Sequence, residues 1–210
     1  MKVWFTSDLH FSHANIIKYC NRPFADVDEM NATLIRNWNE VVGPNDLVWN
    51  LGDVAMGNRK RIPEYRQQLN GRIHLVRGNH DYGKQLDCFD EVHKSAVIEL
   101  DGVTVELIHN PRHVKGLGDV ALVGHIHNKW AVMPKGTVVP EYKAEDHFDA
   151  GFVAPVDIFN VGVDVRGFRP VSLTQVLDQE DFHKEIDDGY CSCGCNAHDQ
   201  CKNPNCCHHA

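Results

Sequence analysis

Short apolar runs alternate with helical periodicity in the first half of the chain. The runs have the length of strands, and polar residues or glycine follow each of them. The expected strands cover residues 2–6, 46–50 and 72–76. A helix is expected between the first two, because a capping-box pattern at Asp26 and Glu29 precedes apolar residues at helical spacing, and Gly43-Pro44 ends it. Its apolar positions are Met30, Leu34, Trp38 and Val41. Shorter helices are expected at 15–19 and 63–69, which gives an α/β pattern.

The second half of the chain is richer in strand patterns. Two β-rich runs, 96–100 and 103–108, flank Asp101-Gly102, which is a strong hairpin signal. Further strands are expected at 120–123, 130–133 and 157–163, and a closing helix at 172–177. Residues 136–155 are irregular and polar, and we expect an excursion near the site there. Apolar periodicity stops near residue 187. We therefore expect one domain over residues 1–186 and a tail over 187–210.

Composition narrows the class of protein. The chain has 210 residues, of which 42% are hydrophobic and 24% charged, as is typical of a soluble globular domain. A formal net charge of -8 disfavours extended nucleic acid as a partner, but it is compatible with a small phosphoester, including a nucleotide. The first residues lack the apolar core of a signal peptide, and no run reaches membrane-spanning length. We expect a cytoplasmic protein with no membrane partner; the sequence does not specify its oligomeric state.

Polar residues of metal-ligand type follow five of the apolar runs. They are carboxylates, an amide and imidazoles, which favour Mn, Fe, Zn, Ni or Co over a soft, thiolate-preferring ion. The candidate metal ligands are Asp8, His10, Asp53, Asn79, His109, His125 and His127. Asp-x-His and His-x-His place both side chains on one side of an extended segment. Gly52, Gly78 and Gly124 stand directly before a candidate and permit a sharp turn or a close approach. Any one of these motifs alone is weak, but their ordered set favours a metal site.

The order of these motifs resembles the calcineurin-like metallophosphoesterase superfamily, over about residues 1–178. Residues 160–164 and 169–173 are similar to the end of its small bacterial and phage members. The resemblance implies a four-layer αββα sandwich, with two mixed β-sheets packed face to face and flanked by helices, and the metal site at strand-end loops. It also implies roles. Asp8, His10 and His127 would bind a first metal. Asn79, His109 and His125 would bind a second. Asp53 would bridge both, and His80 would assist catalysis beside the substrate.

These roles predict a binuclear phosphoesterase that uses two divalent metal ions, with Mn²⁺ first among Mn, Fe, Zn, Ni and Co. Two metals ~3.5–4 Å apart can bind the phosphoryl oxygens and hold a hydroxide for attack on a phosphomonoester or phosphodiester. A metal lowers the pKa of bound water to ~7–9, so hydroxide is available near neutral pH. The alternatives are a nuclease, a non-catalytic metal-binding scaffold of the same fold, and a metal-handling protein.

Other candidates surround the expected ligands. His80 is the candidate general acid, and Asp81 either orients its imidazole or caps the following turn. His13, Arg22 and Arg112 are candidates for substrate binding, the arginines through a bidentate contact to phosphate.

The tail is dense in soft ligands. Its cysteines are Cys191, Cys193, Cys195, Cys201, Cys206 and Cys207. Their gaps are one residue or none, which is a poor match to the two- to four-residue gaps of structural zinc sites. A disordered tail, a metal-scavenging tail and a small domain ordered by an extra Zn²⁺ all remain open, and none of them has a part in catalysis.

Overall fold

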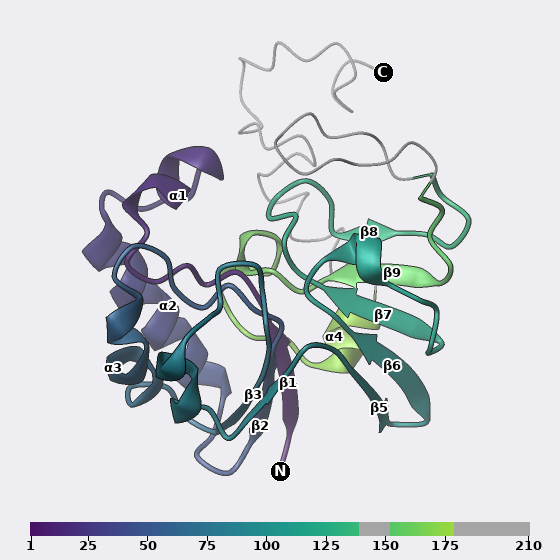
Figure 1. Cartoon of the computed structure of the whole chain (residues 1–210), viewed down its shortest axis with the longest axis horizontal. Helices are drawn as coiled ribbons and strands as arrows, with labels where there is room; N and C mark the ends of the chain where they lie inside the picture. The colour runs from purple at the N-terminus through teal and green to yellow at the C-terminus, as the bar shows by residue number, and fades with distance from the viewer. Residues whose placement is uncertain (139–151, 179–210) are drawn as a thin grey trace.

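The computed structural model describes residues 1–138 and 152–178 of the chain (Figure 1). The expected tail with its six cysteines lies outside the described residues, as does the middle of the polar excursion. The prediction of a domain boundary near residue 187 therefore stays a prediction. Within the described ranges, no helix is long and apolar enough to cross a membrane.

The first sheet has four parallel strands in the order β1-β2-β3-β4. Its strands are β1 (Val3–Thr6), β2 (Leu47–Asn50), β3 (Arg72–Val76) and β4 (Glu91–His93). The first three were expected, and β4 was not, because three residues with two polar side chains carry no readable period. The prediction of two mixed sheets is corrected for this one. It is parallel throughout, because each connection returns through helical segments to the same end of the sheet.

Helices cover one face of this sheet (Figure 1). They are α1 (Ala14–Tyr19), α2 (Val27–Val41), the 3₁₀ helices η1 (Arg59–Arg61) and η2 (Lys84–Cys88), and α3 (Ile62–Arg66). The side chain of Asp26 caps α2 by accepting hydrogen bonds from the amides of Asp28 and Glu29. The Glu29 carboxylate returns to the amide of Ala25 rather than to that of Asp26, which is a variant of the expected capping box. α3 is shorter than the expected helix 63–69.

The second sheet has five strands in the order β5-β6-β7-β9-β8, parallel in its centre and antiparallel at both edges. Its strands are β5 (Ala96–Leu100), β6 (Val103–Leu107), β7 (Val120–Val123), β8 (Val132–Met133) and β9 (Asp157–Asn160). The hairpin predicted at Asp101-Gly102 is confirmed. Both residues have positive φ, 53° and 80°, as a two-residue type I′ turn requires.

The core forms where the two sheets face each other. Phe5, Trp49 and Val76 of the first sheet belong to one buried cluster with Leu107 and Phe159 of the second. Alternate residues of the same first-sheet strands are turned to the helices, because successive side chains of a strand point to opposite faces. Those residues include Trp4, Val48, Ile73 and Leu75, in a cluster with Leu34 and Trp38 of α2.

The predicted two-sheet α/β fold with flanking helices is confirmed, with one difference in its outer layer. α4 (Leu173–Leu177) begins with a capping box of Ser172 and Gln175 and inserts Leu173 and Val176 into the core between the sheets. In the part of the chain that the structure describes, the outer face of the second sheet packs against Val114 and residues 154–156 rather than against a long helix.

We expect Leu34→Ala to lower the free energy of unfolding by ~2–5 kcal/mol, the usual cost of truncating a buried leucine. Leu34 is 1% exposed on the face of α2 that packs against the first sheet. Arg36 on the same helix is a matched control, because its side chain is 61% exposed. Arg36→Ala should stay within about 0.5 kcal/mol of the parent. Urea unfolding followed by circular dichroism measures both, and equal losses in the two variants would contradict this packing.

Candidate metal centre

The seven predicted ligands lie on loops that leave the carboxyl ends of strands in both sheets. Asp8 and His10 follow β1, Asp53 follows β2, and Asn79 follows β3 in the first sheet. His109 follows β6, and His125 and His127 follow β7 in the second. The Asp8 carboxylate joins the two halves, because both its oxygens accept a hydrogen bond from the His125 amide, at 3.1 and 2.9 Å. The structure therefore brings all seven predicted ligands to one place.

The backbone at these ligands is unusual. Five of the seven have a left-handed conformation, at φ values between 50° and 74°. They are Asp8, His10, Asp53, His125 and His127. Side chains other than glycine rarely adopt this conformation, and it persists only where the surrounding structure imposes it. Such strain gathers at functional sites, where the direction of a side chain matters more than local stability.

Two glycines are required by close approach. A Cβ on Gly78 would lie 2.1 Å from Asp53 Oδ1, and a Cβ on Gly124 would lie 2.5 Å from Asp8 Oδ2. Neither glycine has a positive φ, so here the missing side chain matters and the left-handed conformation does not. The glycine that precedes each ligand motif lets another strand's carboxylate approach the backbone.

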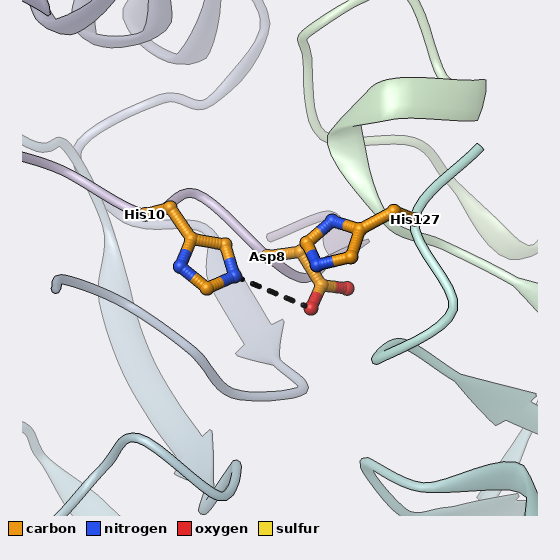
Figure 2. Close-up of side chains that lie close together, drawn as sticks. All are labelled: Asp8, His10 and His127. Atoms are coloured by element: carbon orange, nitrogen blue, oxygen red, sulfur yellow. Dashed lines mark ion pairs between the residues drawn. The ribbon is translucent and has the colours of Figure 1, made fainter. Parts of the chain in front are cut away.

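The first ligand group consists of Asp8, His10 and His127 (Figure 2), whose ligand atoms all lie within 4.8 Å of one another. His10 Nε2 is 4.0 Å from Asp8 Oδ1. Both ring nitrogens of His10 are buried, and neither has a hydrogen-bond partner among the described residues. Burial holds the pKa of His10 well below its ordinary value, although the Asp53 charge opposes this. A buried neutral imidazole with an unused lone pair fits a cation ligand.

The second group consists of Asp53, His109 and His125, with Asn79 beside them. The Asn79 Oδ1 atom is 3.0 Å from His109 Nε2 and 2.9 Å from His125 Nδ1. His109 Nδ1 donates to the Leu51 carbonyl at 2.6 Å, so its Nε2 is directed at Asn79 Oδ1 and at Asp53 Oδ2, 3.4 Å away. Two oxygens without protons face this ring nitrogen, an arrangement that needs a cation, either a proton or a metal ion. Burial alone would lower the pKa of His109, but Asp53 outweighs it and raises the pKa to about 9.

Asp53 lies between the two groups. Its Oδ2 atom is 3.6 Å from His10 Nε2 and 3.4 Å from His109 Nε2. Burial opposes its ionisation, but the hydrogen bond and charge of His109 hold its pKa well below the ordinary value. One ionised oxygen that faces histidines of both groups fits a ligand shared by two cations. The oxygen and imidazole donors also fit the class of divalent ion expected from the sequence.

The sequence model of the calcineurin-like phosphoesterase superfamily domain matches residues 1–140, which contain all seven ligands. The chain belongs to this superfamily. An uncharacterized protein of Methanocaldococcus jannaschii is 39% identical over 180 residues, which are 84% of this chain and 89% of that protein. The gene 66 protein of Mycobacterium phage L5 is 42% identical over 81 residues, 37% of this chain and 39% of its own length.

A solved structure shares the fold. The crystal structure of a protein of unknown function from Aquifex aeolicus has a TM-score of 0.59 to this superfamily member, at 24% identity, and the match covers 89% of this chain and 97% of that one. At this identity the likeness supports the fold alone.

Two further histidines border the ligands of this superfamily member. His80 Nε2 is 4.0 Å from Asp53 Oδ2, and its side chain is 32% exposed, so it faces both the ligand cluster and solvent. The ring centroid of His13 lies 5.5 Å from that of His10. His13 Nδ1 is buried, and the described part of the chain offers it no hydrogen-bond partner. Both residues are therefore placed to meet a molecule bound at the cluster.

Asp81 does not orient His80. Its carboxylate accepts hydrogen bonds from the amides of Asp53 at 2.7 Å, Val54 at 3.1 Å and Gly78 at 2.9 Å. The prediction of a catalytic role is corrected, because both oxygens are used to hold the Asp53 loop. Of the two readings left open by the sequence, backbone capping is the closer one, although the loop that is held lies 28 residues away rather than in the next turn.

Arg22 is also corrected, from substrate binding to a structural role. Its side chain is fully buried and pairs with Asp164, with Nε to Oδ1 at 2.7 Å and Nη2 to Oδ2 at 2.9 Å. It also donates to the backbone carbonyls of Asp8 and Leu9. Every guanidinium nitrogen thus contacts the protein itself, where a phosphate would have to compete.

Asp164 was missed by the sequence reasoning. His127 Nδ1 lies 2.9 Å from Asp164 Oδ2, which leaves Nε2 of His127 for a metal. Burial disfavours the charged imidazole, but Asp164 more than compensates and raises the pKa of His127 to about 11. The only available signal was an acidic residue in the final motif, residues 160–164, whose partner is 37 residues away.

Arg112 lies in η3 (Pro111–His113), three residues after His109, and its contact to a substrate phosphate stays a prediction. The tail cysteines, predicted as an additional metal site, lie outside the described residues.

We expect Asp164→Asn to weaken metal binding by about 10–100-fold, the usual effect of removing the carboxylate that orients a ligating histidine. Asp101→Asn, in the exposed hairpin turn, is the matched control and should leave the affinity unchanged. Competition with a metallochromic chelator measures the affinity, after circular dichroism has established that both variants are folded. An unchanged dissociation constant in Asp164→Asn would show that the pair does not serve the metal.

Proposed function

We propose that the protein is a metal-dependent phosphoesterase that hydrolyses a phosphomonoester or phosphodiester. The superfamily supplies the class, and one observation carries the proposal: a single Asp53 oxygen faces histidines of two ligand groups. One divalent ion would be held by Asp8, His10, Asp53 and His127. The other would be held by Asp53, Asn79, His109 and His125.

Divalent ions at these positions would supply positive charge for the phosphoryl oxygens and make water acidic enough to attack near neutral pH. The protein's own residues fix where this takes place. The Asp53 carboxylate is positioned by the Asp81 clamp on its backbone, and His127 by Asp164. Mn²⁺ heads the expected metals, since the proposed ligands are four oxygen-bearing or imidazole residues for each ion and no thiolate.

His80 is the proposed general acid. Its imidazole is at the exposed border of the cluster, and its backbone amide donates to Asp53 Oδ1 at 2.9 Å, which fixes the residue relative to the proposed shared ligand. An ester bound over the cluster would bring its leaving oxygen within reach of a side chain on this border. His13 lies beside the same cluster and would contact the phosphate or the alcohol portion.

The decisive experiment is a phosphoester panel. Metal-stripped protein should be inactive on aryl phosphate monoesters and diesters, and added Mn²⁺, Zn²⁺, Ni²⁺ or Mg²⁺ should restore turnover of at least one class. Asp53→Ala should bind less metal by elemental analysis and stay inactive with every ion. Two bound metals without turnover of any ester would favour the non-catalytic scaffold, and turnover in chelator would refute a metal-dependent reaction.

We expect His80→Ala to retain its metal content and to lose ~10²–10⁴-fold in kcat, the range for a general acid. His113→Ala, an exposed histidine of η3, is the matched control and should keep the parent kcat. An ester with a strongly acidic leaving alcohol should lose less in His80→Ala, because that alcohol departs without a proton. Near-parental kcat on an ester with a poor leaving group would remove His80 from the reaction.

A further inference from the structure

A second histidine–carboxylate cluster lies on the first sheet, away from the strand-end loops. The strand register aligns Phe5, Trp49, His74 and Glu91 in one row across β1, β2, β3 and β4. This row is on the sheet face that is turned to the second sheet, where Phe5 and Trp49 join the core. His93 stands two residues beyond Glu91, on the same face of the edge strand β4. The row is thus apolar at β1 and β2 and polar at β3 and β4.

The polar end of this row has the geometry of a metal site. Glu91 Oε2 is 2.9 Å from His93 Nε2 and 3.8 Å from His74 Nδ1. The three ligand atoms lie within 4.8 Å of one another. A tetrahedral ion with bonds of about 2.1 Å to nitrogen and oxygen separates its ligand atoms by about 3.4 Å. The two distances to Glu91 lie on either side of that value, so small side-chain rotations would bring the atoms to it.

The buried histidine in this cluster lacks a partner. His74 Nδ1 is shielded from solvent and has no hydrogen-bond partner among residues 1–138 and 152–178. Leaving a polar atom buried and unsatisfied costs free energy. Burial also lowers the pKa of His74 against the pull of Glu91, which leaves a neutral ring whose lone pair can bind a cation.

We propose that His74, Glu91 and His93 bind a divalent cation of the borderline class, such as Zn²⁺, Co²⁺ or Ni²⁺. Two imidazoles and one carboxylate are ligands that these ions accept. Glu91 is 54% exposed and His93 is 30% exposed, so the cluster opens to solvent on one side. Ion entry and a water in the fourth position are both compatible with that opening.

An ion pair is the simpler reading of the same residues, and it explains less. Protonated His93 beside Glu91 would form a partly exposed pair, which contributes little to stability. It would leave His74 Nδ1 unpaired. A bound cation uses all three side chains and accounts for their alignment on one face of two adjacent strands.

The cluster is separate from the candidate metal centre and does not depend on the proposed function. His74 precedes Asn79 by five residues, roughly 16 Å of extended chain. A cation there would fasten the edge strand β4 to β3. β4 leads through Lys94 and Ser95 into β5, which begins the second sheet, so the cation would hold the chain where it crosses between the sheets.

Trp49 provides a reporter. Its ring centroid is 4.9 Å from that of His74 and 5.3 Å from that of His93, so a paramagnetic ion at the cluster should quench its fluorescence. We would titrate the metal-stripped full chain with Ni²⁺ and count bound nickel by elemental analysis after desalting. Glu91→Gln and His93→Ala are the test variants. Glu99→Gln, the same change at an exposed position of β5, is the control. The tail and the candidate metal centre are common to all four proteins and cancel in the comparison.

The parent and Glu99→Gln should bind one equivalent of Ni²⁺ more than Glu91→Gln and His93→Ala. A phase of tryptophan quenching should be lost, or shifted at least tenfold to higher Ni²⁺, in both test variants. Equal nickel content in all four proteins would overturn the proposal. Quenching that survives in Glu91→Gln and His93→Ala but is lost in Asn79→Ala would also overturn it, because the ion responsible would then be at the candidate metal centre.

Discussion

A buried negative charge at Asp53 is the constraint around which the site is arranged. The residue is 2% exposed, and a carboxylate is stable in such a place only if donors or cations surround it. Its Oδ1 accepts from the His80 amide, its Oδ2 faces His10 and His109, and its backbone carbonyl accepts from the His10 amide at 3.0 Å. The Asp81 carboxylate clamps its backbone amide. A change at Asp53 would therefore disturb loops from β1, β2, β3 and β6 together.

The rest of the fold supplies the rigidity that this charge demands. The sheets pack through a continuous apolar core, and the loops that extend beyond it carry the polar residues. A second layer of carboxylates then fixes the loops. Asp81 holds the Asp53 loop, and Asp164 holds His127 while it is itself held by Arg22. Because Arg22 also donates to the carbonyls of Asp8 and Leu9, this one arginine links the first loop of the domain to its last motif.

Much of this could be predicted from the sequence, because it is written in local patterns. The periodicity of α2, the apolar runs of β1 to β3 and the Asp101-Gly102 turn are each contained in a few neighbouring residues. The ligand motifs are also local, and their order along the chain indicated the superfamily. What failed was long-range. β4 exists only because β3 pairs with it, and the outer cover of the second sheet depends on how distant loops pack.

The functional corrections have the same cause. Asp81 and Arg22 have side chains suited to catalysis and phosphate binding, and their composition gave no sign of another use. Their roles are decided by partners 28 and 142 residues away. A residue type near a motif therefore predicts that a side chain is needed there, but only the paired partner determines whether it meets the substrate or supports another residue.

The charges of the metal centre also connect metal binding with protons. In the metal-free protein a proton on His109 Nε2 balances Asp53, which is why the pKa of this histidine is raised to about 9. A metal ion needs the same lone pair and must displace that proton. Below pH 9 the proton and the metal compete, so apparent metal affinity falls as pH decreases. His10 behaves in the opposite way, because burial keeps it neutral and its lone pair is available at once. The two ligand groups that share Asp53 thus differ in the work needed to load them, and the first group accepts an ion at a lower proton cost than the second.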